Sequence, residues 1–488
     1  MYFWLRNTIP MNAFQIILLI ASYFGVLILI SYLTGKKGGN DAFFKANKQS
    51  PWYVVAFGMI GASLSGVTFI SVPGWIEASQ FSYMQVVLGY IVGYLVIGTV
   101  LLPLYYKLNL TSIYTYLEER FGNFSYKTGA SFFLISRVVG ASFRLYLVAN
   151  VLQIILFDDL GIQFWQTVTI TVLLIWLYTF RSGIKTIVWT DTLQTLFMLI
   201  AVGVCIYTIS TEMQITNIFS YVAESELSKT FFFDDVKTGD YFWKRFLAGA
   251  FVAIVMTGLD QDMMQKNLTC KSLKDAQKNM FWFTIVLTIV NFIFLSLGLL
   301  LTVYAQQNGI DAHKDDLFPI LAKNHLGIGV LSFFVIGLIA AAYSSADSAL
   351  TALTTSFSID ILNIEKKYNP QEQVTIRKRI HVFISLILIL VIISFKYLIK
   401  DESVIAKLFV FAGYTYGPLL GLYAFGLFTK LKVKDKLVPI VAILSPVLSY
   451  FISVNSLKWF GFEFGFFILI LNGFLTFLGL ILIYRKQN

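Results

Sequence analysis

A polar cluster interrupts an otherwise apolar stretch of the sequence. Residues 340–348 read Ala-Ala-Ala-Tyr-Ser-Ser-Ala-Asp-Ser, so three serine hydroxyls and one carboxylate are close together. Side chains three or four residues apart share one face of a helix, and hydroxyl, carbonyl and carboxylate oxygens are the ligands that a small hard cation prefers. Serines alone are also common where membrane helices pack together, but a carboxylate in such a segment favours an ion site.

The composition indicates that these residues lie in a membrane. The chain is 57% hydrophobic and 13% charged, and its repeated apolar runs are long enough to cross a hydrocarbon layer of ~30 Å. The predicted fold class is an all-α membrane protein with about 13 transmembrane helices. The loops are too short for a separate core, so residues 1–488 are expected to form a single transmembrane domain. The spans are expected at residues 13–34, 52–79, 83–106, 127–156, 162–180, 185–209, 243–265, 280–305, 329–362, 380–399, 403–428, 437–456 and 462–484.

Basic residues predict the orientation, because cytoplasmic loops carry an excess of Lys and Arg. Most of the 37 basic residues fall on one side of the membrane if the N-terminus is outside. We therefore expect a multi-pass protein of the cell membrane with a cytoplasmic C-terminus, and the net charge of +10 needs no nucleic-acid partner. The basic residues assigned to the inner side include Lys36, Lys37, Lys107, Arg120, Lys266, Lys271, Lys274, Lys278, Lys366, Lys367, Arg377, Lys434 and Arg485.

Two expected spans are interrupted at comparable places. Residues 61–66 read Gly-Ala-Ser-Leu-Ser-Gly, and residues 257–262 read Thr-Gly-Leu-Asp-Gln-Asp. Small and polar residues favour unwinding, and the breaks lie five expected spans apart, as in two inverted repeats. Backbone carbonyls freed at such breaks need partners and can coordinate sodium. The alternative is a glycine-mediated crossing of helices.

Several motifs in sequence order carry a family resemblance. Residues 111–118 read Thr-Ser-Ile-Tyr-Thr-Tyr-Leu-Glu, 120–122 read Arg-Phe-Gly, and 188–194 read Val-Trp-Thr-Asp-Thr-Leu-Gln, ahead of the serine-rich ninth span. Over about residues 40–430 the chain resembles the sodium:solute symporter family, which includes sodium/glucose, proline and sialic acid cotransporters. The resemblance implies a leucine-transporter-type fold with two inverted five-helix repeats. These repeats would be residues 52–209 and 243–428, with one extra helix at 13–34 and extra helices at 437–484.

The resemblance also implies two sodium sites. The main site would use backbone carbonyls and serine hydroxyls, supplied by Gly61, Leu64, Ala341, Ser344 and Ser345. A second site, known in the sialic acid branch, would match Asp191, Ser344, Asp347 and Ser348. The chain departs from that branch at Asp347, where the branch has serine. Two nearby carboxylates could bind a second sodium more strongly or share a proton, and Asp191 could alternatively only tie helices together.

Substrate-binding positions are implied by the same resemblance. Ser63, Ser65 and Thr68 look like substrate positions of the sialic acid branch, and Arg137 resembles its carboxylate-binding arginine, while Gln85 is a weaker candidate.

A second arginine follows in the same span. Arg144 lies two turns beyond Arg137 on nearly the same helix face, and guanidinium suits a bidentate grip on carboxylate. Alternatively, the two arginines pair with Asp260, Asp262 or another buried acid.

These observations predict a sodium-coupled symporter that imports a small organic solute by alternating access, such as a sialic acid or another sugar acid. The expected partners are the solute, Na+ and the lipid bilayer. A neutral sugar or amino acid symporter and a transport-dead solute sensor are the alternatives. A channel would show rings of repeated filter residues, and an enzyme would show a nucleophile with its base and orienting group, and the sequence presents neither pattern.

Overall fold

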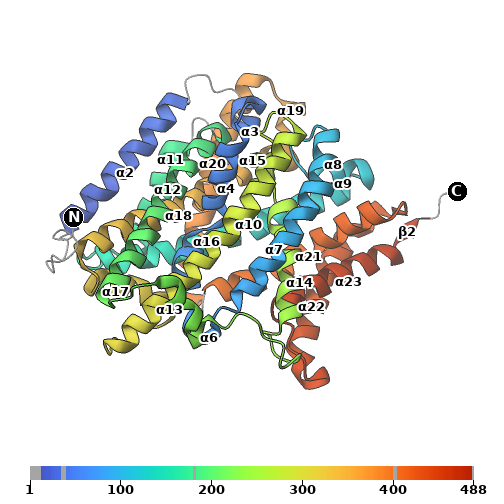
Figure 1. The fold of residues 1–488 in the computed structure, drawn as a ribbon. Coiled ribbons are helices and arrows are strands. Elements are labelled where there is room, and N and C mark those ends of the chain that lie inside the picture. The colour runs from blue at the N-terminus through green and yellow to red at the C-terminus, as the bar shows by residue number, and fades with distance from the viewer. Residues whose placement is uncertain (1–12, 35–39, 180–182, 399–403, 486–488) are drawn as a thin grey trace.

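The computed structural model describes residues 13–34, 40–179, 183–398 and 404–485, nearly all of them in helices (Figure 1). Ten of the described helices are long and apolar enough to cross a membrane, or twelve if each of two bent helix pairs counts as one span. The expected span at 162–180 corresponds to a shorter apolar helix, Phe164–Leu177. A helical protein with many spans is therefore confirmed, while the count of thirteen stays a prediction.

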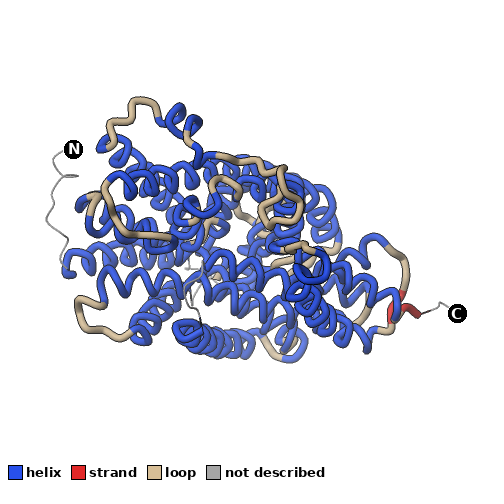
Figure 2. Tube along the Cα trace, turned by 90° about the horizontal axis from the view of Figure 1, so that it is seen from below, coloured by secondary structure: helices blue, strands red, loops and turns tan. Residues whose placement is uncertain are grey.

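The elements follow one another along the chain as a nearly continuous series of helices (Figure 2). A short antiparallel pair, β1 (Lys432–Val433) and β2 (Tyr484–Arg485), joins two segments near the end of the chain. The helices are α2 (Ala13–Thr34), α3 (Asn40–Lys45), α4 (Trp52–Ser63), α5 (Gly66–Gly74), α6 (Ile76–Ser79), α7 (Tyr83–Val96), α8 (Leu102–Lys107), α9 (Thr115–Arg120), α10 (Asn123–Leu152), α11 (Phe164–Thr179), α12 (Ile184–Glu212), α13 (Ile218–Glu224), α14 (Phe242–Ala253), α15 (Gln261–Asn267), α16 (Leu273–Gln307), α17 (Leu317–Asn324), α18 (Gly327–Ser356), α19 (Ile364–Lys367), α20 (Pro370–Leu398), α21 (Val404–Phe428), α22 (Val438–Phe460) and α23 (Ile468–Leu482).

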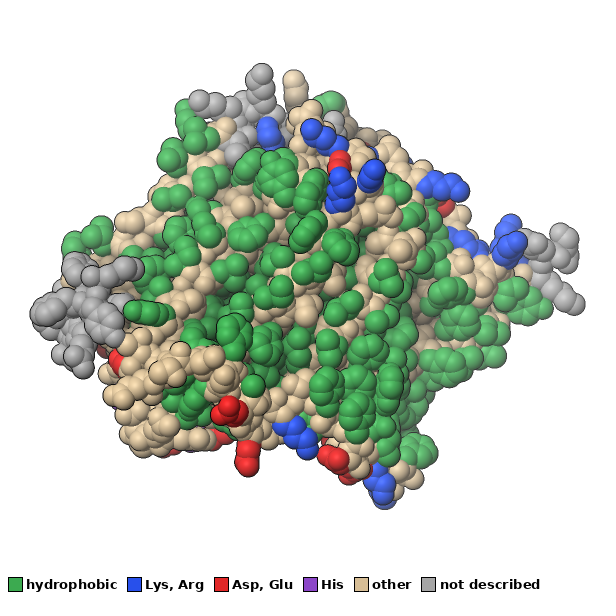
Figure 3. Space-filling view, viewed as in Figure 1, with side chains coloured by type: hydrophobic (Ala, Val, Ile, Leu, Met, Phe, Trp, Pro, Cys, Tyr) green, Lys and Arg blue, Asp and Glu red, His purple; other side chains and the backbone are tan. Residues whose placement is uncertain are grey.

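The outer surface carries the apolar band expected of a membrane protein. On the face shown in Figure 3, hydrophobic side chains cover the middle of the molecule, while charged side chains gather at the upper and lower edges. Lys and Arg predominate at the upper edge, where Figure 1 places α3, α8, α9 and α19. These helices belong to segments that the charge pattern assigns to the cytoplasmic side. Lys36 and Lys37 of that assignment lie outside the described residues.

Two helices extend further than the apolar runs predicted. α16 begins at Leu273 rather than 280, and α20 begins at Pro370 rather than 380. Capping explains both starts. The Ser272 hydroxyl accepts a hydrogen bond from the Asp275 amide at 3.2 Å, and Asn369 and Glu372 bond each other's amides reciprocally at 3.0 and 3.2 Å, which is a capping-box arrangement. The predicted loop at 363–379 is therefore largely helical.

Helices α7 and α14 cross with their backbones in contact. A Cβ added at Gly89 would collide with the Phe246 carbonyl oxygen, and one added at Gly249 would collide with the Val86 carbonyl oxygen. Small residues allow such close approach between membrane helices. These glycines are therefore required by the crossing itself.

The Arg-Phe-Gly motif ties the start of α10 to the end of α21. The Arg120 guanidinium donates to the carbonyl oxygens of Thr429 and Leu431, each at 2.9 Å. Asp435 accepts from the amides of Phe124 and Ser125 at 2.9 and 2.8 Å, where a negative charge is favoured by the helix N-terminus. This part of the motif has a structural role.

Candidate functional site

The first predicted break is confirmed. α4 and α5 are bent by 53° across Leu64 and Ser65, and Leu64 (φ −83°, ψ 67°) and Ser65 (φ −65°, ψ 175°) leave the helical conformation. The carbonyl oxygens of Gly61 and Leu64 accept no backbone amide hydrogen bond from the described residues. Both carbonyls are therefore free to bind a cation, as a broken membrane helix requires.

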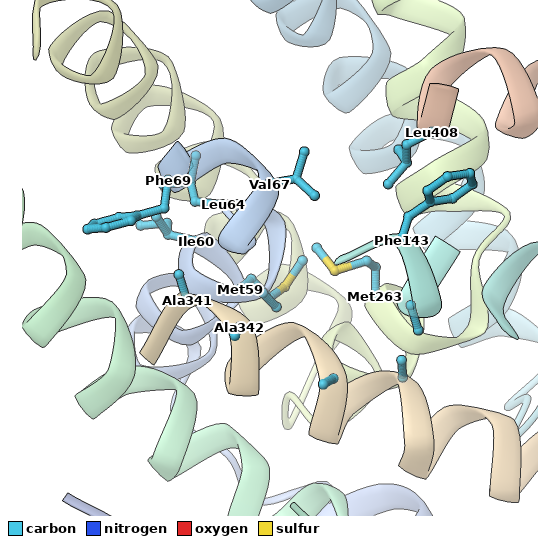
Figure 4. Close-up of a cluster of buried hydrophobic side chains, with 14 of the residues drawn as sticks. Met59, Ile60, Leu64, Val67, Phe69, Phe143, Met263, Ala341, Ala342 and Leu408 are labelled. Atoms are coloured by element: carbon cyan, nitrogen blue, oxygen red, sulfur yellow. The ribbon is translucent and has the colours of Figure 1, made fainter. Parts of the chain in front are cut away.

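Helix α18 lies directly against this break. A Cβ added at Gly61 would be 3.3 Å from the Ser344 hydroxyl oxygen, and one at Gly66 would be 3.7 Å from the Ala342 Cα. Figure 4 shows Ala341 of α18 near Ile60 and Ala342 near Met59 of the broken span. Glycine at 61 and 66 therefore lets the freed carbonyls face the serines of α18. The structure thus places the Ser344 hydroxyl next to Gly61, while the Ser345 hydroxyl donates to the Ala342 carbonyl of its own helix at 3.0 Å.

A second buried cluster surrounds Asp191 of α12, which has no solvent exposure. The Ser344 hydroxyl donates to Asp191 Oδ1 at 2.7 Å, and the Ser348 hydroxyl lies 3.5 Å from Oδ2. Asp347, also fully buried, follows on the same helix as these serines. The predicted ligands Asp191, Ser344 and Ser348 are thus in mutual contact.

A lysine also enters this cluster. The Lys266 ammonium lies 2.6 Å from Asp191 Oδ2, and the side chain is only 1% exposed. Lys266 lies in the last turn of the second broken span, and its side chain points into the protein rather than into a loop. The second break is itself confirmed as a 69° bend between residues 242–258 and α15.

Ser344 connects the two clusters. A serine hydroxyl has one proton to donate and two lone pairs that accept. Because Asp191 takes the proton, the lone pairs of the Ser344 oxygen are left for a cation at the break. The carboxylate thereby orients a ligand of the neighbouring site.

A cavity opens beside the first break. Its volume is about 80 Å³, which is smaller than the ~300–1,000 Å³ common for ligand pockets. Tyrosines and apolar side chains of α7, α14 and α21 complete its wall. Of the predicted substrate-binding residues, its lining includes Ser63, Ser65, Thr68, Arg137 and Arg144.

Gln85 lies outside the lining of that cavity. Its side-chain amide donates to the Asp240 carbonyl at 3.0 Å and accepts from the Phe232 amide at 3.3 Å. These contacts fasten the segment before α14 to the start of α7. We therefore leave Gln85 out of the candidate substrate site.

The two arginines differ in their partners. Arg137 forms ion pairs with Asp262 and, at 3.9 Å between Nη1 and Oδ2, with Asp260. Asp260 also accepts from the Asp262 and Met263 amides at 2.9 and 3.3 Å, which caps α15. Arg137 thus pairs with buried acids of the protein, which is one of the two alternatives that the sequence allowed.

Arg144 has a different environment. It is 9% exposed and lines the cavity, yet no described carboxylate lies within ion-pair distance of it. Its Nε is buried without a hydrogen-bond partner. Buried arginine is normally paired with an acid or faces an anion. The site therefore offers a positive charge to a ligand at Arg144.

Known proteins are similar to this chain over most of its length. The model of the sodium:solute symporter family matches residues 43–434. The sodium/sialic acid symporter SiaT of Proteus mirabilis is 24% identical over 84% of this chain and 83% of its own. The sodium/sialic acid symporter NanT of Aliivibrio fischeri is 24% identical over 93% and 91%.

One solved structure supports the fold. A substrate-bound, outward-open Na+-coupled sialic acid symporter aligns with a TM-score of 0.81 at 20% identity, covering 97% of this chain and 99% of its own.

Proposed function

The chain belongs to the sodium:solute symporter family, and we propose that it imports a small organic anion, such as a sialic acid or another sugar acid, with sodium. The observation that carries the substrate class is Arg144, a buried cation at a cavity wall with no acid of the described chain within ion-pair distance. Guanidinium binds carboxylate through two parallel hydrogen bonds. The hydroxyls of Ser63, Ser65 and Thr68 would bind the polar groups of the sugar.

Sodium coupling follows from the geometry of the break. A sodium ion bound by the carbonyls of Gly61, Leu64 and Ala341 and the hydroxyls of Ser344 and Ser345 would hold the broken span against α18. Inward opening would separate these elements and release the ion. One positive charge moved inward gains ~2.3 kcal/mol per 100 mV of membrane potential, which favours accumulation of solute.

We extend the proposal to topology. The proposed topology has about thirteen spans, two inverted repeats at 52–209 and 243–428, an outside N-terminus and a cytoplasmic C-terminus. The excess of Lys and Arg on one side supports this orientation and an odd number of spans. The two bends of 53° and 69° support the repeats, because they fall at corresponding positions of the proposed halves.

Uptake into proteoliposomes tests the function. We expect a radiolabelled sialic acid to accumulate under an inward sodium gradient, and to remain near equilibrium when potassium replaces sodium. A neutral sugar of similar size is expected to compete weakly. Preference for the neutral sugar or an amino acid would contradict the anion proposal, and saturable binding without uptake would indicate a solute sensor instead.

Alanine variants test the main sodium site. Ser344→Ala and Ser345→Ala are each expected to raise the sodium concentration for half-maximal uptake about tenfold or more, because each removes one ligand oxygen at a net cost of ~1.5–3 kcal/mol for a bond to a charged group. Ser332→Ala is the matched control, since Ser332 lies earlier on α18 and donates to the Ile328 carbonyl at 2.8 Å. Unchanged sodium dependence in both test variants would rule out this ligand set.

A further inference from the structure

Lys266 occupies the place that the family resemblance gives to a second sodium ion. Its ammonium lies 2.6 Å from Asp191 Oδ2, the oxygen that also lies 3.5 Å from the Ser348 hydroxyl. Asp191 and Ser348 are both predicted ligands of that ion, and Ser344, a third, bonds the other carboxylate oxygen. A positive charge is therefore already present where the second ion would bind.

The backbone around Lys266 holds this charge in place. All residues of α15 are buried. The Lys266 carbonyl accepts from the Thr269 hydroxyl at 2.7 Å, and the Gln265 amide donates to the Phe44 carbonyl at 2.8 Å. The Asn267 carbonyl accepts from the Tyr106 hydroxyl at 3.0 Å. Three separate contacts thus fix the segment that carries the ammonium.

The charges of the cluster favour one mobile cation rather than two. Asp191 and Asp347 contribute two negative charges and Lys266 one positive charge when all are ionised. One sodium at the adjacent main site brings this total to zero. A second sodium at Asp191 would add an unbalanced positive charge in a buried place, where like charges repel strongly and unpaired charges are costly.

We propose that the Lys266 ammonium is a tethered cation that replaces the second sodium, so that the protein binds one sodium ion per transport cycle. This inference rests on the proposed function as a sodium symporter. Unlike an ion, the ammonium cannot leave with the solute. It therefore keeps a positive charge beside Asp191, the carboxylate that orients Ser344. It adds nothing to the ion gradient that drives transport.

Equilibrium binding of radioactive sodium to the purified protein, without solute, tests the proposal. The parent is expected to bind one sodium at saturation. Lys266→Ala is expected to bind two, because it vacates the site and leaves Asp191 and Ser348 available. Lys266→Arg, which keeps the charge, is expected to bind one. In Lys266→Ala, adding Ser348→Ala should remove the second ion or weaken it at least tenfold.

A purely structural tie between Lys266 and Asp191 would not create a sodium site. Two ions bound by the parent, or one ion bound by folded Lys266→Ala, would overturn the proposal. If Lys266→Ala is unstable without sodium, high sodium should restore its melting temperature, and failure to do so would also overturn it. A parent that binds no sodium would instead refute the proposed function.

Discussion

Arg144→Ala is expected to weaken binding of an anionic sugar by ~2–5 kcal/mol, or about thirtyfold to several thousandfold. Arg144 is the cavity arginine without an acid of the described chain nearby, so its loss removes the charge available to a substrate carboxylate. Binding of a sialic acid and of its neutral methyl ester, compared by calorimetry, measures the effect. The ester should bind the variant and the parent with similar affinity.

Two further variants separate charge from geometry. Arg144→Lys keeps the positive charge but loses the planar fork, so we expect an intermediate affinity. Arg137→Ala leaves the buried Asp260 and Asp262 without their partner, and is expected to lower stability rather than to act on the carboxylate alone. If Arg144→Ala binds both compounds as the parent does, Arg144 does not bind the substrate carboxylate.

Asp191→Asn is expected to destabilise the protein by ~3–5 kcal/mol, because it leaves the buried Lys266 ammonium without its paired carboxylate. The pair is 1% and 0% exposed, so water cannot replace the lost partner. The double variant Asp191→Asn/Lys266→Met should recover much of the stability, since it removes both charges. Thermal unfolding in one detergent at constant sodium compares both variants with the parent.

An exposed ion pair provides the control for this comparison. Lys323 and Asp159 lie 3.6 Å apart with 29% and 64% exposure, so Asp159→Asn should change stability by no more than ~1 kcal/mol. Equal losses in the Asp191 single variant and the double variant would show that the two buried charges are not coupled.

The sequence predicts the spans and the breaks because their signals are local. α2 occupies 13–34 as expected, and the helical conformation is lost at Leu64 and Ser65, where small and polar residues lie in an apolar run. The starts of α16 and α20 were missed because capping side chains, rather than hydropathy, determine them.

The partners of individual charged residues could not be predicted from local sequence patterns. Lys266 follows a broken span and precedes several lysines, so it resembled a residue at the membrane edge. Its partner Asp191 is 75 positions away in sequence. Likewise, only the fold shows that Arg137 meets Asp262 while Arg144 does not. The sequence therefore shows where a basic residue lies along the chain, but not which acid pairs with it.

The glycine crossing of α7 and α14 has a consequence for motion. Backbone meets backbone at Gly89 and Gly249, so neither helix can slide past the other without steric collision, and the pair must turn as one rigid block. Alternating access requires parts that move against each other. The relative movement must then occur at other contacts. The contact between the broken span and α18 is one such place, because the proposed sodium ligands there can separate. An ion bound between the broken span and α18 would then act directly at the contact that has to separate.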